Sequence, residues 1–440
     1  MPEDRIRLLS LNCWGLKFVS KNRRERIRAI ANQLAHSNHD IVALQEVWVW
    51  ADYQHIQSSV SRSLPHSKLF YSGALGSGLA IFSRFPIIGC SISPYSLNGA
   101  PIDVGGGDWF VGKAAASVII DHPVLGQVQV FNTHLYAKGG EDGPEYNRAH
   151  RIVNAWEFSK LARQAAELGR YVIAMGDFNS VPTTLPIAII REHAGLSDSW
   201  VVAHPDSLYV QPINSPQQAV EKFGVTADSP LNSYSAGKPL DPHARQYLGK
   251  RLDYIFYRQP RKSSHLPPQY FIRASKCQVA MLERVPGYRF SYSDHFGLEA
   301  TLDIVATVPD DPETLVLGSA YDIAEAGRRK PTVEVDPVLS KQTIDTMVRA
   351  LVSCHHFAQY RAKKELIGFG ICIALLVGAI VSSVWVNHGW ITPIIIVVTI
   401  FLAWLGTTLL YEGFIYGNWE CNALMNVIEE LDVHKSTLAD

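Results

Sequence analysis

Two uncharged apolar stretches near the carboxyl end constrain this chain more than any other feature. Residues 366–386 and 391–411 are each 21 residues long and contain no Asp, Glu, Lys or Arg. As helices that rise about 1.5 Å per residue, both are long enough to cross a hydrocarbon core of about 30 Å. The alternative, two core helices of a soluble domain, would need further polar-faced helices to cover them. We therefore expect a transmembrane hairpin that turns at Asn387-His388-Gly389-Trp390.

Basic residues before the first stretch set the expected orientation. Arg361, Lys363 and Lys364 lie just ahead of residue 366, and by the positive-inside rule this end stays in the cytosol. An even number of spans returns the tail to the same side. Six separated cysteines without a CxxC pair agree with a reducing compartment. We expect a cytosol-facing catalytic domain on the endoplasmic reticulum or, as the alternative, on a mitochondrial or other internal membrane.

The regions that flank the hairpin each carry an apolar stripe at helical spacing. The first stripe comprises Ile344, Met347, Val348, Leu351 and Val352, and the second comprises Leu424, Val427, Ile428 and Leu431. We expect the two helices to pack together as a stalk that lifts the catalytic domain from the membrane. The expected division is 1–305 for the catalytic domain, 306–339 for a linker, 340–365 for an amphipathic helix, 366–411 for the hairpin and 412–440 for a tail helix.

Polar residues follow apolar, strand-like segments at five places in the first 300 residues. These places are Asn12, Glu46, Asn132-Thr133-His134, Asp177-Phe178-Asn179 and Ser293-Asp294-His295, the last after a run from Tyr288 to Tyr292. Carboxylates, amides and imidazoles at strand ends are poor core residues. They are well suited to hold a hard divalent cation beside a general base. The pattern therefore predicts one hydrolytic site where these strand ends converge.

The order of these motifs, with Arg251-Leu252-Asp253-Tyr254-Ile255, resembles the endonuclease/exonuclease/phosphatase superfamily, whose type case is deoxyribonuclease I. Within it, the segment from Gly107 to Lys113 and the hydrophobic C-terminus are similar to the neutral sphingomyelinases and the fungal inositol phosphosphingolipid phospholipases C. The resemblance implies an α/β fold in which two packed β-sheets are flanked by helices as a four-layer sandwich. It also implies Mg²⁺-dependent hydrolysis of phosphodiesters.

The metal position is expected at Glu46, where Mg²⁺ would stabilise charge on the phosphate and the leaving oxygen. Asn12 would support the metal or the phosphate, although an isolated Asn after a strand is usually a turn residue. Asp294 would also lie near the metal. The alternative for Glu46, a solvated side chain before an aromatic run, does not fit its Gln-Glu context.

His295 is expected to be the general base, because an imidazole can take a proton from water near neutral pH. Its orienting carboxylate would be Asp253 rather than Asp294, since adjacent residues on an extended chain point to opposite sides. His134 would donate to a phosphate oxygen or to the leaving alkoxide. Asp177 would orient water, and Asn179 would donate to the transition state.

The segment from Gly107 to Ala114 reads formally as G-x-x-x-x-G-K, but Ala114 replaces the Ser or Thr that a nucleotide-binding loop needs. ATP binding is therefore rejected. By resemblance, Asp108 and Lys113 form an acid–base pair needed for activity. The alternatives are that Lys113 binds the lipid phosphate directly, or that the two residues are an ordinary surface hairpin pair.

These inferences predict a membrane-anchored phospholipase C that converts phosphosphingolipids to ceramide and a phosphorylated head group. Anionic phospholipids are the expected activators, and the motif layout slightly favours inositol phosphate over phosphocholine. A net charge of −1 gives no basic footprint for nucleic acid. The rivals are a nuclease or phosphoinositide phosphatase on the same fold, and an inactive membrane-tethered scaffold. The sequence leaves the oligomeric state open.

Two loop regions complete the expected site. Residues 204–250 are rich in Pro, Ser, Gly and Asn, and a loop of this length is usually functional. We expect it to form a wall over the substrate. Trp48, Trp50 and Tyr53 follow Glu46 and would either rest at the membrane interface or lie in the core.

Overall fold

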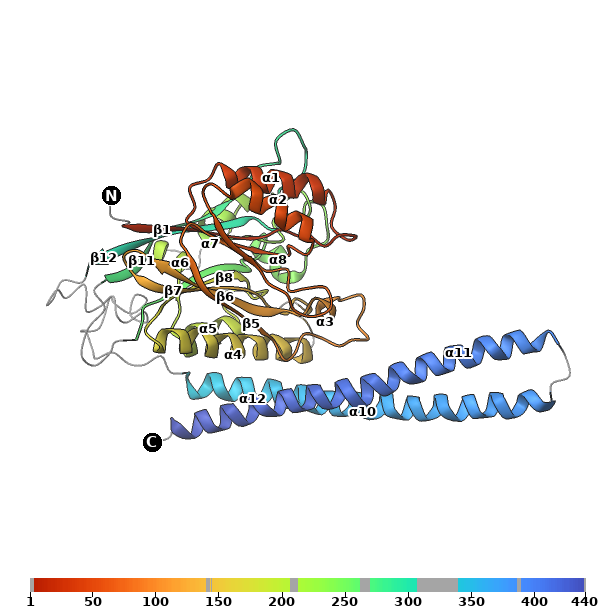
Figure 1. Cartoon of the computed structure of the whole chain (residues 1–440). Coiled ribbons are helices and arrows are strands. Elements are labelled where there is room, and N and C mark those ends of the chain that lie inside the picture. The colour runs from red at the N-terminus through yellow and green to blue at the C-terminus, as the bar shows by residue number, and fades with distance from the viewer. Residues whose placement is uncertain are drawn as a thin grey trace.

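The computed structural model describes residues 4–139, 143, 145–205, 213–261, 270–306, 339–385 and 389–438. Residues 4–306 contain two six-stranded sheets that pack face to face. In Figure 1, α1 and α2 cover one outer face, and α4 and α5 cover the other. The expected four-layer arrangement is therefore confirmed.

The first sheet has its two parallel neighbours, β1 and β2, at its centre. Its order is β11 (Tyr270–Ala280), β12 (Gly297–Ala306), β1 (Arg5–Asn12), β2 (Ile41–Gln45), β4 (Ala80–Ser83) and β3 (His66–Leu69). Helices α1 (Arg23–Ala35) and α2 (Trp50–Val60) cover it. Ile27, Ile30 and Leu34 are buried against the sheet, which confirms the helical period read from the sequence.

The second sheet also has a parallel pair, β7 and β8, near its centre. Its order is β5 (Ile87–Pro94), β6 (Ala114–His122), β7 (Gly126–His134), β8 (Tyr171–Asp177), β10 (Asp253–Arg258) and β9 (Ser197–Asp198). Its outer face is covered by α4 (Glu145–Glu167) and α5 (Leu185–Ala194). The shorter helices are α3 (Asp108–Val111), α6 (Ser199–Ala203), α7 (Pro216–Phe223) and α8 (Pro242–Tyr247).

Strand pairing brings the predicted motifs to one edge of the sandwich. In the first sheet Asn12 pairs with Gln45, the residue before Glu46. In the second sheet His134 pairs with Asp177, and Asp177 pairs with Asp253 on the antiparallel side. The parallel strands β1, β2, β7 and β8 bring their carboxyl ends to this edge, and the antiparallel strand β10 brings its amino end, with Asp253, to the same edge.

One local expectation needs correction, and one open alternative is decided. The run from Tyr288 to Tyr292 is not a strand, because the chain reverses there: the Val285 N–H donates to the Phe290 carbonyl at 2.9 Å, and Gly287 has a φ of 82°. The aromatic alternation that indicated a strand instead places Tyr288 beside Phe290. Tyr53 lies on α2 and is buried, so it belongs to the core, whereas Trp50 at the start of α2 is half exposed.

The region from residue 204 to 250 has more regular structure than expected. It contains α7 and α8, whose first turns are capped by Ser215 and Asp241, respectively. Residues 206–212 lie outside the described part of the chain.

The carboxyl-terminal region forms two long helical segments. The first comprises α10 (Lys341–Ser382) and a short continuation, η2 (Ser383–Trp385). The second comprises α11 (Ile391–Leu410), a π-helical turn η3 (Tyr411–Tyr416) and α12 (Gly417–Thr437). Both are long and apolar enough to cross a membrane, and only 6% of each apolar window is buried within the protein. The expected turn residues Asn387 and His388, and linker residues 307–338, lie outside the described part.

The two apolar stripes pack against each other, as expected. Leu351 on α10 and Leu424 on α12 are both fully buried in the same cluster. That cluster also contains Ile152 and Trp156 of α4. The helix pair also lies against α4 of the catalytic domain (Figure 1), a contact that the sequence did not predict.

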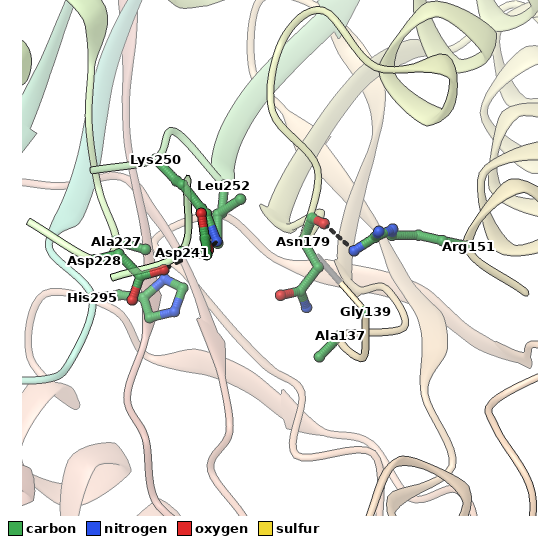
Figure 2. Close-up of a pocket in the computed structure, with 10 residues that line it drawn as sticks. All are labelled: Ala137, Gly139, Arg151, Asn179, Ala227, Asp228, Asp241, Lys250, Leu252 and His295. Carbon is green, nitrogen blue, oxygen red and sulfur yellow. Dashed lines mark hydrogen bonds and ion pairs between the residues drawn. The ribbon is translucent and has the colours of Figure 1, made fainter. Parts of the chain in front are cut away.

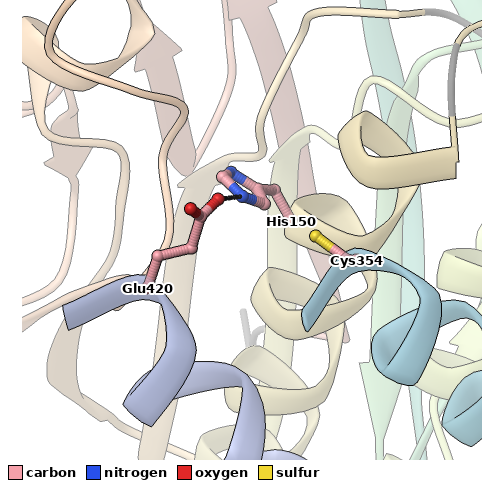
Figure 3. A group of neighbouring side chains, drawn as sticks. All are labelled: His150, Cys354 and Glu420. Carbon is pink, nitrogen blue, oxygen red and sulfur yellow. Dashed lines mark hydrogen bonds and ion pairs between the residues drawn. The ribbon is translucent and has the colours of Figure 1, made fainter. Parts of the chain in front are cut away.

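A buried polar cluster fastens this contact (Figure 3). His150, Cys354 and Glu420 lie close enough together to hold a metal ion, but their hydrogen bonds favour another role. The Gly99 N–H donates to Nδ1 of His150 at 2.9 Å, so Nε2 carries the proton and donates to Glu420 at 2.9 Å. Arg361 also donates to Glu420. The cluster thus joins α4, α10 and α12 through satisfied polar contacts.

Candidate active site

Asn12 joins the two sheets at the centre of the site. Its Nδ2 donates to a Glu46 oxygen at 3.0 Å and to an Asp177 oxygen at 3.0 Å. Its Oδ1 accepts from the Trp14 N–H, so in this orientation Asn12 positions the two carboxylates. Glu46 has a φ of 59°, and such left-handed conformations at non-glycine residues gather at functional sites. The carbonyl of Glu46 also leaves no room for a Cβ at Gly15.

His295 lies between two carboxylates. Its Nδ1 is 2.8 Å from Asp253, and its Nε2 is 3.8 Å from Asp177. The structure thus places Asp253, not Asp294, as the hydrogen-bond partner of the imidazole. Burial alone would lower the pKa of His295, but the charges of Asp253 and Asp177 outweigh it and raise that pKa well above its ordinary value.

Glu46 and Asp294 form an acidic region beside this pair. Burial, and then the charge of Asp294, raise the pKa of Glu46, and burial likewise raises the pKa of Asp294. Buried carboxylates are costly unless a cation compensates them. These carboxylates are therefore of a kind that could hold a divalent cation. A second group, Asp177, Asp253 and His295, has ligand atoms within 4.8 Å of one another.

His134 and Lys113 occupy the other side of Asp177. Nε2 of His134 lies 2.7 Å from the Lys113 ammonium and 3.4 Å from Asp177. Lys113 also lies 3.2 Å from Asp108 and donates to the Leu135 carbonyl at 3.1 Å. Since Lys113 is only 2% exposed and contacts a site histidine, the interpretation as a surface hairpin pair is wrong.

Asn179 follows Asp177 on a tight turn. Its N–H donates to Asp177 Oδ1 at 2.9 Å, and its own φ is 46°. Phe178 points the opposite way, into the core, where its ring contacts Tyr254 and Phe256. The turn thus anchors itself with an aromatic ring while holding both polar side chains at the site. The Asn179 amide also donates to the Leu135 carbonyl at 2.9 Å.

A cavity of about 400 Å³ opens beside these residues (Figure 2). His295 lies on one side of it, and Asn179 lies on the other with Arg151, which donates to the Asn179 carbonyl at 2.6 Å. Lys250 adds a second positive charge and is paired with Asp228 and Asp241. The expected wall from residues 204–250 therefore contributes to the cavity.

Two of these basic residues were not expected at the site. Arg151 lies on α4 without a motif around it, and only its near-complete burial marks it as unusual. Lys250 directly precedes the Arg251 to Ile255 motif, three residues before Asp253, and this position could have indicated that it lies at the site.

The two-sheet fold and its acidic, histidine-containing site agree with the family to which the sequence comparison assigns the chain. The chain belongs to the Endonuclease/Exonuclease/phosphatase family, which matches residues 9–295. Among curated proteins it is 36% identical to the inositol phosphosphingolipids phospholipase C of Schizosaccharomyces pombe, over 98% of this chain and 94% of that protein. The protein of the same name in Saccharomyces cerevisiae is 31% identical, over 97% of this chain and 89% of that one.

Animal proteins match a shorter part of the chain. The putative neutral sphingomyelinase of Drosophila melanogaster is 30% identical over 75% of this chain and 68% of that protein. Among solved structures, beta toxin from Staphylococcus aureus aligns with a TM-score of 0.46 and 20% identity, over 67% of this chain and 99% of that chain. The resemblance drawn from the motifs is confirmed by the family match and the curated relatives.

Proposed function

We propose that this protein is a membrane-anchored, Mg²⁺-dependent phospholipase C that hydrolyses phosphosphingolipids to ceramide and a phosphorylated head group. The observation that carries the proposal is the convergence of three pairs on Asp177: Asn12 with Glu46, Asp253 with His295, and Lys113 with His134. Relatives named as phospholipases C of inositol phosphosphingolipids match the chain over nearly its whole length.

Glu46 and Asp294 would hold the Mg²⁺ ion, with Asn12 supporting Glu46. Both carboxylates are oxygen ligands of the kind that Mg²⁺ prefers. Bound there, the ion supplies a Lewis acid that stabilises negative charge on the phosphate and the leaving oxygen. The raised pKa of each carboxyl group shows that its charged form is unfavourable in this buried position, and a bound cation would stabilise that charged form.

His295 takes a proton from the attacking water, and Asp253 holds the imidazole in the required tautomer and orientation. Water attacks phosphorus in line, and the bond from phosphorus to the ceramide oxygen breaks. Asp177 orients the water, since it lies within 4 Å of both site histidines. Lys113 supplies the donor for the leaving oxygen while His134 accepts a hydrogen bond from its ammonium, and Asn179 donates to the phosphate.

The bilayer is proposed to hold the protein through α10 and α11. The catalytic domain then lies on the cytosolic side of an internal membrane, such as the endoplasmic reticulum, because Lys363 and Lys364 precede the first span. These two side chains are exposed, so they are available to anionic phospholipids as activators. Arg361 is engaged by Glu420 instead.

Inositol phosphate is the favoured head group. The two fungal relatives match 98% and 97% of this chain, whereas the animal relatives match between 58% and 75% of it. The cavity also offers Arg151 and Lys250 to a phosphorylated polyol.

The test is incubation of the full-length protein with inositol phosphosphingolipid, sphingomyelin, a phosphoinositide and abasic DNA, each with and without Mg²⁺. We expect Mg²⁺-dependent ceramide release, faster from the inositol lipid. Cleavage of DNA or release of inorganic phosphate without any ceramide would overturn the proposal. No turnover of any substrate would favour the scaffold instead.

A further inference from the structure

The loop between β5 and α3 is fastened to the helices that leave the membrane region. The Tyr416 hydroxyl donates to the Gly99 carbonyl at 2.5 Å. The Glu412 carboxyl group lies beside the backbone N–H of Ile102. These two contacts fix the height of the loop, that is, its position along the axis of the second apolar helix.

That height places the loop at the boundary of the proposed span. Glu412 is the first residue after the uncharged stretch, and Tyr416 lies four residues further along. At about 1.5 Å per residue, the two contacts therefore fall within roughly 8 Å of the end of the apolar stretch. A bilayer's headgroup region extends over a similar depth beyond its hydrocarbon core.

The tip of this loop is apolar and exposed. Ile102 is 51% exposed and Val104 is 71% exposed. Figure 1 shows α3, which follows the loop, on the side of the catalytic domain toward which α10 and α11 extend. Leu75 lies on a neighbouring segment that contacts α3, and its side chain is 53% exposed. Exposed apolar side chains at this height meet lipid rather than bulk water.

We propose that the loop from Ile102 to Val104 inserts into the interface of the same bilayer that holds α10 and α11. This inference rests on the proposed membrane anchoring. The loop thus adds a membrane contact from the catalytic domain to the one made by α10 and α11. Asp108 follows four residues after Val104, and Asp103 pairs with Lys138 on the segment that follows His134. Insertion therefore holds the Lys113 and His134 side of the site at the lipid surface, where a phosphosphingolipid head group can enter without leaving the bilayer.

The first test measures depth rather than activity. Single cysteines at Val104, Trp404 and Ile88 are introduced into the full-length protein carrying Cys90→Ser and Cys421→Ser, then labelled with an environment-sensitive fluorophore. The protein is reconstituted in anionic vesicles that contain spin-labelled quencher lipids. Ile88 is 54% exposed at the far end of β5, about 20 Å along the strand from the loop, and so is the matched control.

We expect lipid quenching at positions 104 and 404 and none at position 88. Quenching at 404 but not at 104 overturns the loop insertion and leaves the anchor intact. Absence of quenching at 404 shows that the anchoring itself is wrong. A label at 104 that is shielded from water but not quenched by lipid identifies a protein partner and also overturns the inference.

The second test separates interfacial from soluble turnover. Ile102→Glu combined with Val104→Glu should lower hydrolysis of vesicle-embedded substrate at least tenfold, whereas hydrolysis of a short-chain substrate below its micelle concentration should be unchanged. Ile88→Glu should change neither rate. Equal loss on both substrates, or loss on neither, would contradict the proposal.

Discussion

The ammonium nitrogen of Lys113 lies 2.7 Å from Nε2 of His134, and both residues are almost fully buried. The imidazole must then accept a hydrogen bond from Lys113 and remain neutral. Burial, and secondarily the charge of Lys113, lower the pKa of His134 well below its ordinary value. Lys113 is therefore a hydrogen-bond donor and His134 a neutral acceptor next to Asp177.

Lys113→Met should lower turnover by about 10²-fold or more, because it removes a donor from the leaving oxygen. Lys113→Arg should not restore the rate, since a planar fork cannot replace a compact ammonium in this space. Steady-state kinetics would measure the turnover of each variant, and unfolding midpoints would show whether each variant is folded. Lys222→Met on the exposed face of α7 is the control. A Lys113→Met protein with near wild-type turnover would exclude Lys113 from the reaction.

Glu46→Ala should abolish hydrolysis while the protein remains folded, with less than a tenth of wild-type turnover at saturating Mg²⁺. Stability gives an independent readout. Because the pKa of Glu46 is raised in the folded protein, metal-free wild type should lose stability as the pH rises above about 4.5. Glu46→Gln should lose less, and Mg²⁺ should stabilise only the wild type. Melting curves with and without Mg²⁺ across this pH range would decide.

Asp253→Asn should change the pH dependence of turnover. Asp253 raises the pKa of His295, and the base must be neutral to act, so the wild-type rate rises as the pH increases through that pKa. In the variant the acidic limb should move to lower pH, and the maximal rate should fall. His295→Ala should cost several orders of magnitude more. A profile of Asp253→Asn that equals the wild type in shape and height would exclude the orienting role.

Anionic lipid should act through Lys363 and Lys364 but not through Arg361. The two lysines are exposed, whereas Arg361 is paired with Glu420 at 2.5 Å. Each lysine near an anionic leaflet contributes about 1 kcal/mol. Replacing both with Gln should reduce activation in anionic vesicles and should leave activity in zwitterionic vesicles unchanged. Equal activity of wild type in both vesicle types, at every salt concentration, would argue against anionic activation.

Cysteines placed at Leu351 and Leu424 should form an intramolecular cross-link in membranes, because both side chains are buried in one cluster. A pair at Leu351 and Val433 serves as the control, since Val433 is 67% exposed. The products can be separated on a denaturing gel by mobility. A well-expressed Leu351 and Leu424 pair that gives only intermolecular products would place the two helices apart.

The strand-end motifs were predictable because their signal is local. Each apolar run fixes a strand, and the polar residue that follows it must lie at the sheet edge, as at Asn12, His134 and Asp177. Asp253, which lies at the start of β10, was instead favoured as the partner of His295 because Asp294 points to the opposite side and because the family resemblance agrees. The run from Tyr288 to Tyr292 misled because its aromatic residues also suit a turn in which the rings of Tyr288 and Phe290 contact each other.

The contact between the carboxyl-terminal helices and the catalytic domain could not be read in the same way. Helix α4 is buried on more than one face, with Phe158 toward the sheet and Trp156 toward α12. A helix with several apolar faces shows no single stripe, so its second partner is not visible in its sequence pattern. Arg151 escaped notice for a similar reason, because its role depends on a residue 28 positions away.

Helix α10 runs without a break from Lys341 to Ser382, so one rod belongs both to the contact with α4 and to the proposed span. A rod without a hinge cannot absorb a mismatch between its apolar length and the surrounding hydrocarbon, and it responds by tilting. Because the catalytic domain is packed against the same rod, it must tilt as well. For the proposed span, membrane thickness would then set the angle at which the catalytic cavity faces the bilayer, and turnover of the proposed lipid substrate would depend on the acyl-chain composition of the host membrane.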